Sequence, residues 1–246
     1  MTLYERLDLY KAAIDRIRPF EGDILQQLRK YYRIGLTWTS NALEGNTLNE
    51  LETKILLEDG LTIGGKPIRD TLEAVGHSRA YDYMFGLLGT RRITIQDIKA
   101  LHLLFYKAID ERNAGVWRDV DIIVTGTDYR FPSPAELSYQ MEILESWMAE
   151  RDSMHPVCFA AMLHLNFVTV HPFIDGNGRV ARLLLNAALI QDGYMLAVIP
   201  PILRLDYLTA IRHYQQRSDA SPFCDFIAER VLESEKEMIR LLRIPL

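Results

Sequence analysis

The most informative stretch of this chain reads HPFIDGNGRVAR and runs from His171 to Arg182. It places an imidazole, a carboxylate, two glycines around a small amide, and two guanidinium groups within one short span. Glycine backbone at a helix start lets N–H groups converge on an anion, and arginine has the side chain best shaped for phosphate oxygens. The combination predicts a site that holds a polyphosphate with a metal ion and moves a proton beside it.

The residues after the glycines are apolar at helical spacing, so we expect a helix that begins at this stretch. Arg179 and Arg182 are three residues apart and therefore lie near one face of that helix. Asp175 precedes the glycines and can offer a carboxylate to Mg²⁺, which usually takes one or two carboxylates plus substrate phosphates. His171 carries the side chain that exchanges a proton near neutral pH.

Each of these residues also has a structural interpretation when it is considered alone. His171 then reads as a hydrogen-bonded core histidine, Asp175 as a helix N-cap, and the two arginines as members of surface ion pairs. The stretch also contains G-x-G-x-x-A, a dinucleotide-binding pattern that requires a preceding strand in a βαβ unit. A helix and His-Pro-Phe precede it here, so we reject the dinucleotide fold.

The composition excludes several classes of protein. The 246 residues are 48% hydrophobic and 25% charged, which is ordinary for a globular chain with a sizeable core. The net charge of −5 argues against non-specific nucleic-acid binding as the main task. No signal-peptide pattern opens the sequence, and no apolar run reaches membrane-spanning length. The two cysteines, Cys158 and Cys224, suit buried free thiols. We therefore expect a cytoplasmic protein with no membrane or direct nucleic-acid binding.

Helical patterns with start and stop signals account for most of the chain. A Ser or Thr followed three residues later by an acidic residue opens several of them, and prolines or glycines end them. The expected helices cover roughly residues 2–18, 23–36, 47–59, 67–87, 94–109, 133–148, 156–170, 180–192, 205–216 and 222–243.

One segment departs from the helical pattern. Asp121–Val124 and Tyr129–Phe131 resemble short strands on either side of the turn-forming Thr125–Asp128. We therefore predict a short β-hairpin there. The whole pattern predicts an all-α fold, a helical bundle with one short hairpin.

The stretch from His171 to Arg182 is a full match to the signature H-P-F-x-[DE]-G-N-G-R-x-x-R, so the chain resembles Fic-domain proteins. Ala114–Arg118 and the hairpin before Ser133 look like the family's flap and the segment in front of it. The resemblance implies a Fic-type domain at residues 37–230, which includes an inhibitory helix. Residues 1–36 would form an N-terminal helical extension, and residues 231–246 the end of the C-terminal helix.

The resemblance implies a protein adenylyltransferase, which transfers AMP from MgATP to a hydroxyl side chain of a target protein. His171 would be the general base for that hydroxyl, and Asp175 would bind Mg²⁺. The Asn177 side chain would lie at the α-phosphate, Arg179 at the β-phosphate and Arg182 at the γ-phosphate. The residues implied to hold ATP are Gly176, Asn177, Gly178, Arg179 and Arg182.

A second motif lies upstream, where SNALEG runs from Ser40 to Gly45. Ser40 and Glu44 share a helix face because they are four residues apart, and Gly45 suits the position that ends a helix. Periodicity alone favours a short surface helix with Glu44 in water. The stretch also resembles the family's inhibitory motif, [ST]-x-x-x-E-[GN]. That resemblance implies that Glu44 pairs with Arg182, takes the place of the γ-phosphate and inhibits the chain intramolecularly.

Other assignments leave alternatives open. In the family interpretation the flap, from Ile122 to Phe131, binds the target protein by adding a strand. Tyr207 either stacks on adenine or is a core aromatic, and Gln215 or Gln216 contacts the base. The helices before Thr37 and after Ser221 are candidates for homodimer contacts.

The reaction also has rivals at this level. The same fold would suit AMP removal, phosphoryl transfer or another nucleotide donor. A non-enzymatic nucleotide sensor or partner-binding module is the third hypothesis, and the intact His171 and Asp175 argue against it.

Overall fold

The computed structural model describes residues 1–90, 92–151 and 154–245, and every regular element in these residues is helical. Short 3₁₀ turns precede or follow several helices, and a π-helical turn at Ile55–Asp59 continues the third one. The α-helices are α1 (Leu3–Asp15), α2 (Gly22–Ala42), α3 (Glu50–Lys54), α4 (Ile68–Gly86), α5 (Ile95–Tyr106), α6 (Leu137–Met148), α7 (Pro156–Val170), α8 (Asn177–Gln191), α9 (Arg204–Arg217) and α10 (Ser221–Leu242).

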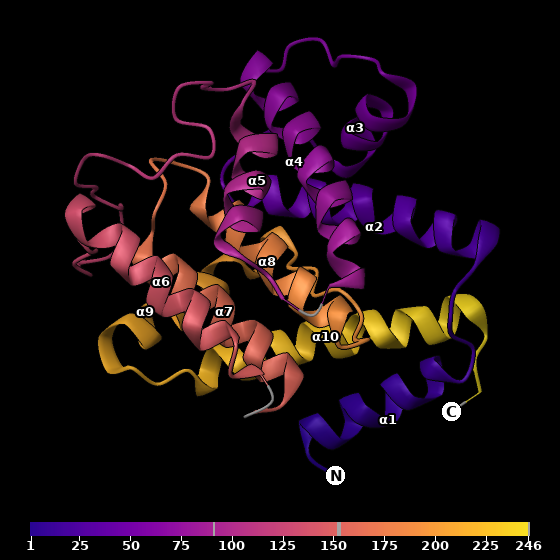
Figure 1. Cartoon of the computed structure of the whole chain (residues 1–246). Helices are drawn as coiled ribbons and strands as arrows, with labels where there is room; N and C mark the ends of the chain where they lie inside the picture. The colour runs from indigo at the N-terminus through magenta and orange to yellow at the C-terminus, as the bar shows by residue number, and fades with distance from the viewer. Residues whose placement is uncertain (91, 152–153, 246) are drawn as a thin grey trace.

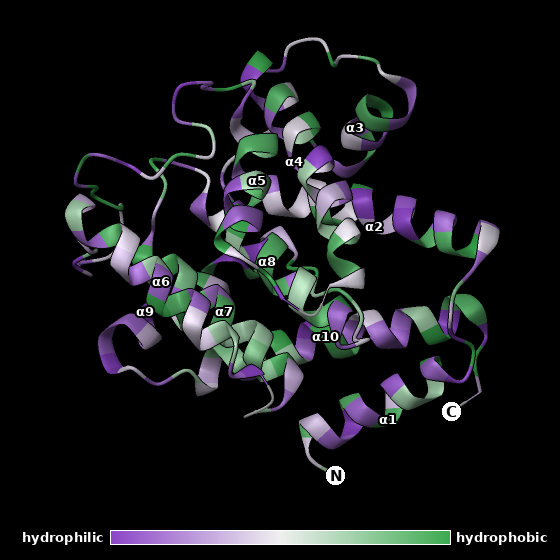
Figure 2. Cartoon of the chain, viewed as in Figure 1, coloured by the Kyte–Doolittle hydropathy of each residue, from purple (hydrophilic) through white to green (hydrophobic). Residues whose placement is uncertain are grey.

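Helices α7 and α8 form the centre of the bundle (Figure 1). Both are apolar around most of their circumference, which is typical of helices enclosed by others on all sides (Figure 2). Helices α4 and α5 pack on one side of α8, and α10 packs on α7. The signature fills the connection between α7 and α8, residues 171–176, and the first turns of α8, so the packing of the two central helices fixes where it lies.

Three of the predicted helix starts are confirmed together with their predicted capping boxes. Thr2, Thr94 and Ser133 each share reciprocal side-chain and backbone hydrogen bonds with the acidic residue three positions later. The predicted capping box at Thr47 is wrong by two residues. Asn49 caps α3 instead, because the Thr47 hydroxyl donates to the Asp70 carboxylate at 2.6 Å.

The predicted β-hairpin is absent from the described residues. Residues 121–131 form two extended arms around a turn in which Gly126 has a φ of +87°, and no strand ladder joins the arms. A two-stranded ribbon is marginal by itself, and no third strand supports this one. Arg118 holds the base of the segment instead, since its guanidinium donates to the carbonyls of Val120, Pro132 and His171.

Both predicted domain boundaries fall inside helices. Position 36 lies within α2 and position 231 within α10, so the two ends share elements with the middle of the chain. Helix α1 packs along α10, and both termini lie on the same side of the molecule (Figure 1). None of the described helices is both long enough and apolar enough to cross a bilayer.

Two buried histidines predict how stability depends on pH. Burial lowers the pKa of His77 to about 3 and keeps the pKa of His164 well below its ordinary value. In the unfolded chain both rings become protonated below about pH 6.5, whereas in the folded chain they stay neutral. The free energy of unfolding should therefore decrease as pH falls from 6.5 to 5, by about 1.4 kcal/mol per pH unit for each ring.

Urea unfolding at pH 7, 6 and 5 measures this decrease. The His77→Gln variant should lose the contribution of His77, while the other buried histidines keep theirs, and it should show a smaller decrease than the wild type. Equal pH dependence in both proteins would contradict the assignment to His77.

Candidate functional site

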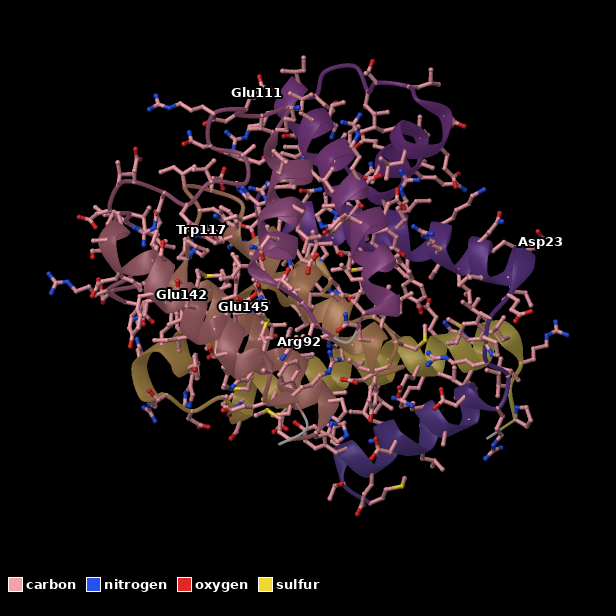
Figure 3. All side chains as sticks on the ribbon, viewed as in Figure 1. Asp23, Arg92, Glu111, Trp117, Glu142 and Glu145 are labelled. Atoms are coloured by element: carbon pink, nitrogen blue, oxygen red, sulfur yellow. The ribbon has the colours of Figure 1, made fainter. Side chains whose placement is uncertain are left out.

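The end of helix α7 sets the direction of the signature loop. His171 adopts a left-handed backbone conformation with φ of 52°, and its N–H donates to the Phe167 carbonyl at 3.0 Å. The following Pro172 disfavours further helix at this position. Phe173 is fully buried, with the His102 ring stacked on it at a centroid distance of 3.7 Å. Trp117, labelled in Figure 3, packs on the same ring at 4.8 Å.

The Asn177 side chain closes this loop. Its Oδ1 accepts the Phe173 N–H at 2.9 Å, and its Nδ2 donates to the Phe173 carbonyl at 2.8 Å. Asn177 is buried, so both polar ends of its amide serve the loop. The contact of this side chain with an α-phosphate stays a prediction, since the hydrogen bonds found here are to the loop itself. The amide shapes the loop from within.

Close packing explains both glycines. Gly176 has a φ of +81°, and a Cβ there would lie 2.8 Å from the Phe105 ring. A Cβ on Gly178 would collide with the Glu44 carboxylate and lie 3.1 Å from the Arg182 guanidinium. The backbone at the start of α8 therefore approaches a bound carboxylate directly. Unpaired N–H groups and the helix dipole favour an anion at this place.

The predicted contact between Glu44 and Arg182 is present. Arg182 is buried, and its Nη2 donates to Glu44 Oε1 at 2.8 Å. The same guanidinium donates to the Ser40 hydroxyl at 2.9 Å, to the Ser40 carbonyl at 2.8 Å and to the Tyr207 hydroxyl at 3.1 Å. Four acceptors from α2, the turn that follows it, and α9 thus surround a single buried cation.

Glu44 is ionised in this setting. Burial raises the pKa of its carboxyl, but Arg182 and Arg179 outweigh that effect and bring the net pKa below its ordinary value. The carboxylate remains 35% exposed, so one side of it faces the solvent. Arg204 of α9 holds this turn from outside by donating to the Leu43 carbonyl at 2.7 Å.

Arg179 belongs to a second ionic network. Its Nη1 lies 2.9 Å from Glu73 Oε1, and its Nη2 lies 3.1 Å from Asp175 Oδ1. Arg69 bridges the same two carboxylates, at 3.0 Å from Glu73 and 2.7 Å from Asp175. Neither Arg69 nor Glu73 is recognisable as a site residue from the sequence. Their spacing of four residues on α4 marks an ordinary surface pair, and only the fold brings it to the signature.

Asp175 is the candidate metal ligand of the site. Burial raises the pKa of its carboxyl, but Arg179, the Gly176 N–H and Arg69 outweigh burial and lower the net pKa. Among the described residues no group of three or more metal-ligating side chains occurs. A half-exposed, ionised carboxylate beside an anion-binding helix start suits a Mg²⁺ ion held mainly by phosphates.

His171 lies beside the same cavity with a defined tautomer. Its Nδ1 is 3.2 Å from the Val168 carbonyl, which can only accept, so Nδ1 carries the proton and Nε2 is the free base. Burial lowers the pKa of His171 to about 4, and Arg118 adds to this effect. The imidazole is therefore neutral at pH 7.

A cavity of about 450 Å³ joins these groups. Its walls include the His171 side chain, Gly178, the Glu44 carboxylate, the flap segment around Gly126, and helix α9. Gln215 lines it, whereas Gln216 does not, and the Gln215 carbonyl accepts from the Thr127 hydroxyl at 3.1 Å.

Tyr207 lies at the inner end of this cavity as a largely buried aromatic. Its hydroxyl accepts from Arg182 and lies 2.8 Å from His164 Nε2. The contacts seen here are those of a core residue, the alternative that the sequence left open, and they position Arg182.

The residues of this site lie within the part of the chain that resembles known proteins. Residues 92–189 match the family model described as Fic/DOC family. The chain is 34% identical over 235 residues to a protein adenylyltransferase Fic of Drosophila willistoni, covering 93% of this chain and 46% of that protein. It is 32% identical over 230 residues to the protein of the same name from Culex quinquefasciatus, covering 92% and 45%. The chain therefore spans about half the length of the curated relatives it matches.

Solved structures agree with this assignment. Fic-1 from C. elegans superimposes with a TM-score of 0.85 at 27% identity, over 96% of this chain and 70% of that one. A Fic domain containing signaling protein from Bacteroides thetaiotaomicron gives 0.85 at 26% identity, over 96% and 95%. With its complete signature, its helical fold and these relatives, the chain belongs to the Fic/DOC family.

Proposed function

We propose that this chain is a protein adenylyltransferase that uses MgATP and is inhibited by its own Glu44. The observation that carries the proposal is the arrangement around one cavity. A neutral histidine with a free Nε2 lines it, and so does the Glu44 carboxylate, which the buried Arg182 binds. The relatives named protein adenylyltransferase Fic support the same reaction.

In the proposed reaction the hydroxyl oxygen of the target attacks the α-phosphorus of ATP. The new O–P bond forms as the bond from the α-phosphorus to the bridging oxygen breaks, and pyrophosphate leaves. His171 Nε2 accepts the hydroxyl proton, since Nδ1 is held by the Val168 carbonyl. General-base assistance of this kind is worth typically about 10²–10⁴-fold in rate.

The phosphates bind where the protein now holds its own carboxylates. Glu44 occupies an anion position between Gly178 and Arg182, so a terminal phosphate and Glu44 compete for the same donors. Arg179 now contacts the carboxylates of Glu73 and Asp175. In the proposed reaction its guanidinium also donates to the neighbouring phosphate. Autoinhibition then follows from competition, because Glu44 displaces the nucleotide from its reactive alignment.

Asp175 would hold Mg²⁺ together with phosphate oxygens, and the metal supplies positive charge that stabilises the leaving pyrophosphate. Arg69 now donates to the same carboxylate, so this chain keeps a cation at that position in the resting arrangement. The role of the chain in this step is to keep Asp175 ionised and aimed at the start of α8.

The extended arms of residues 122–131 are the proposed docking edge for the target protein. Their backbone groups are not joined to each other, and the Ile123 side chain is 99% exposed. A target strand that pairs with one arm would place its hydroxyl beside His171, because Phe131 packs on that imidazole at 4.8 Å. We also propose that the edge of Tyr207 that lines the cavity contacts adenine. The outer helices are the proposed contact surface of a homodimer.

Replacing Glu44 should release the activity. The Glu44→Gly variant frees Arg182 and opens the anion position beside Gly178, so label from α-³²P-ATP should appear on protein, including self-labelling. Adding His171→Ala to this variant should reduce labelling by about 10²–10⁴-fold. Autoradiography of the single and double variants measures both changes.

Glu111→Gly is the matched control, since Glu111 lies in the outer loop after α5 (Figure 3) and its side chain is 81% exposed. This variant should behave as the wild type. Equal labelling by Glu44→Gly and by the double variant would refute AMP transfer by His171. Transfer of label from γ-³²P-ATP would establish phosphoryl transfer instead.

The low pKa of His171 predicts the pH profile of the released variant. Because the pKa is lowered to about 4, the imidazole is the free base throughout pH 6–8, and its contribution is lost only as pH falls toward 4. The value of kcat/KM for ATP, which reports the free enzyme, should therefore not decline between pH 8 and pH 6. A histidine of ordinary pKa would cost about half the rate near pH 6.5, and such a decline would contradict the assignment.

A further inference from the structure

The two cysteines of the chain lie together, although 65 residues separate them in the sequence. Cys158 is in the first turn of α7 and Cys224 in the first turn of α10, and their Sγ atoms are 2.9 Å apart. A disulfide has an S–S length of about 2.05 Å, so the two sulfurs need to approach by less than an ångström. Both thiols are free in this structure.

We propose that Cys158 and Cys224 form a peroxide-sensitive dithiol that closes to an intramolecular disulfide between α7 and α10. The sequence alone favoured two inert buried thiols. The structure differs because Cys158 is only partly buried, whereas Cys224 is buried behind it. An oxidant from solution therefore reaches Cys158 first, and the resolving thiol already touches it.

The surroundings of the pair favour this order of events. The hydrogen bond between the two thiols lowers the pKa of Cys158 to about 7, so a large fraction of Cys158 is thiolate at neutral pH. The first turn of a helix adds positive potential to each sulfur. Asp225, Asp219 and Tyr4 are titratable groups near the pair. Asp225 opposes ionisation of both thiols, and Asp219 opposes that of Cys224.

The reaction balances with hydrogen peroxide as the oxidant. The Cys158 thiolate attacks one peroxide oxygen, an S–O bond forms, the O–O bond breaks, and the departing hydroxide takes a proton to become water. Cys158 is now a sulfenic acid. The Cys224 sulfur then attacks the Cys158 sulfur, the S–S bond forms, and the hydroxyl leaves as water with the Cys224 proton. Two thiols are oxidised, and one peroxide is reduced to two waters.

The bond would join two helices that support the proposed active site, at the end of α7 opposite His171. Helix α7 ends at His171, and Phe223, the neighbour of Cys224, stacks on His164 at a centroid distance of 4.8 Å. His164 in turn lies 2.8 Å from the hydroxyl of Tyr207, which contacts Arg182. The inference itself does not depend on the proposed function, because it rests on the two thiols alone.

The test treats the full chain with a small excess of hydrogen peroxide. Free thiols are then counted under denaturing conditions, and the digest is analysed by non-reducing mass spectrometry. Both thiols should disappear, a peptide pair joined through Cys158 and Cys224 should appear, and dithiothreitol should restore both thiols. Oxidation should also raise the thermal midpoint by roughly 5–10 °C, because the disulfide restricts the unfolded chain.

Two variants separate the roles of the sulfurs. Cys224→Ala should accumulate a sulfenic acid on Cys158 that dimedone captures, and Cys158→Ser should show no dimedone adduct and no shift of the midpoint. The proposal is overturned if the treated wild type keeps both thiols. It is also overturned if Cys158 proceeds to sulfinic acid without a joined peptide, or if the oxidised product is a reducible dimer.

Discussion

The buried guanidinium of Arg182 is the constraint on which the rest of the site depends. A charge removed from water is tolerated only where hydrogen-bond acceptors replace the solvent around it. Ser40 and Glu44 supply three of these acceptors and Tyr207 the fourth. Because they come from α2, the turn after it, and α9, satisfying one cation brings both helices to the start of α8. The loop between α7 and α8 is then held from both sides.

Much of this arrangement is predictable from local sequence signals, and the reasons are physical. Capping boxes and prolines act within a few residues, so the starts of α1, α5 and α7 follow from them. The expected ends of α1 and α5, at residues 18 and 109, lie beyond the observed ends at Asp15 and Tyr106. The contact of Glu44 with Arg182 joins distant parts of the chain, and only the family motif predicts it. The predicted hairpin of the flap was wrong, because a two-stranded ribbon needs support from further strands that no local pattern reveals.

The contacts of Asn177 and Glu73 could not be predicted from the sequence, because each depends on how the folded backbone surrounds the side chain. Asn177 sits in a motif that looks entirely directed at a ligand, yet its amide is consumed by the backbone of Phe173. Glu73 gives no local signal, but it connects the two ionic networks. Its Oε1 holds Arg179, and its Oε2 accepts from Asn46, two residues after Glu44, at 3.0 Å. The turn that carries Glu44 is therefore connected to both arginines.

The ionic contacts described around the signature also balance one another in charge. Arg69, Arg179 and Arg182 face three carboxylates, those of Glu73, Asp175 and Glu44. The resting site therefore has no uncompensated positive charge among these groups, because the protein's own carboxylates neutralise its guanidinium groups. In the proposed reaction a phosphate would exchange for a carboxylate, and a metal ion would exchange for a guanidinium. Occupancy of this site is an ion exchange, in which selectivity between ligands matters more than the total charge they carry.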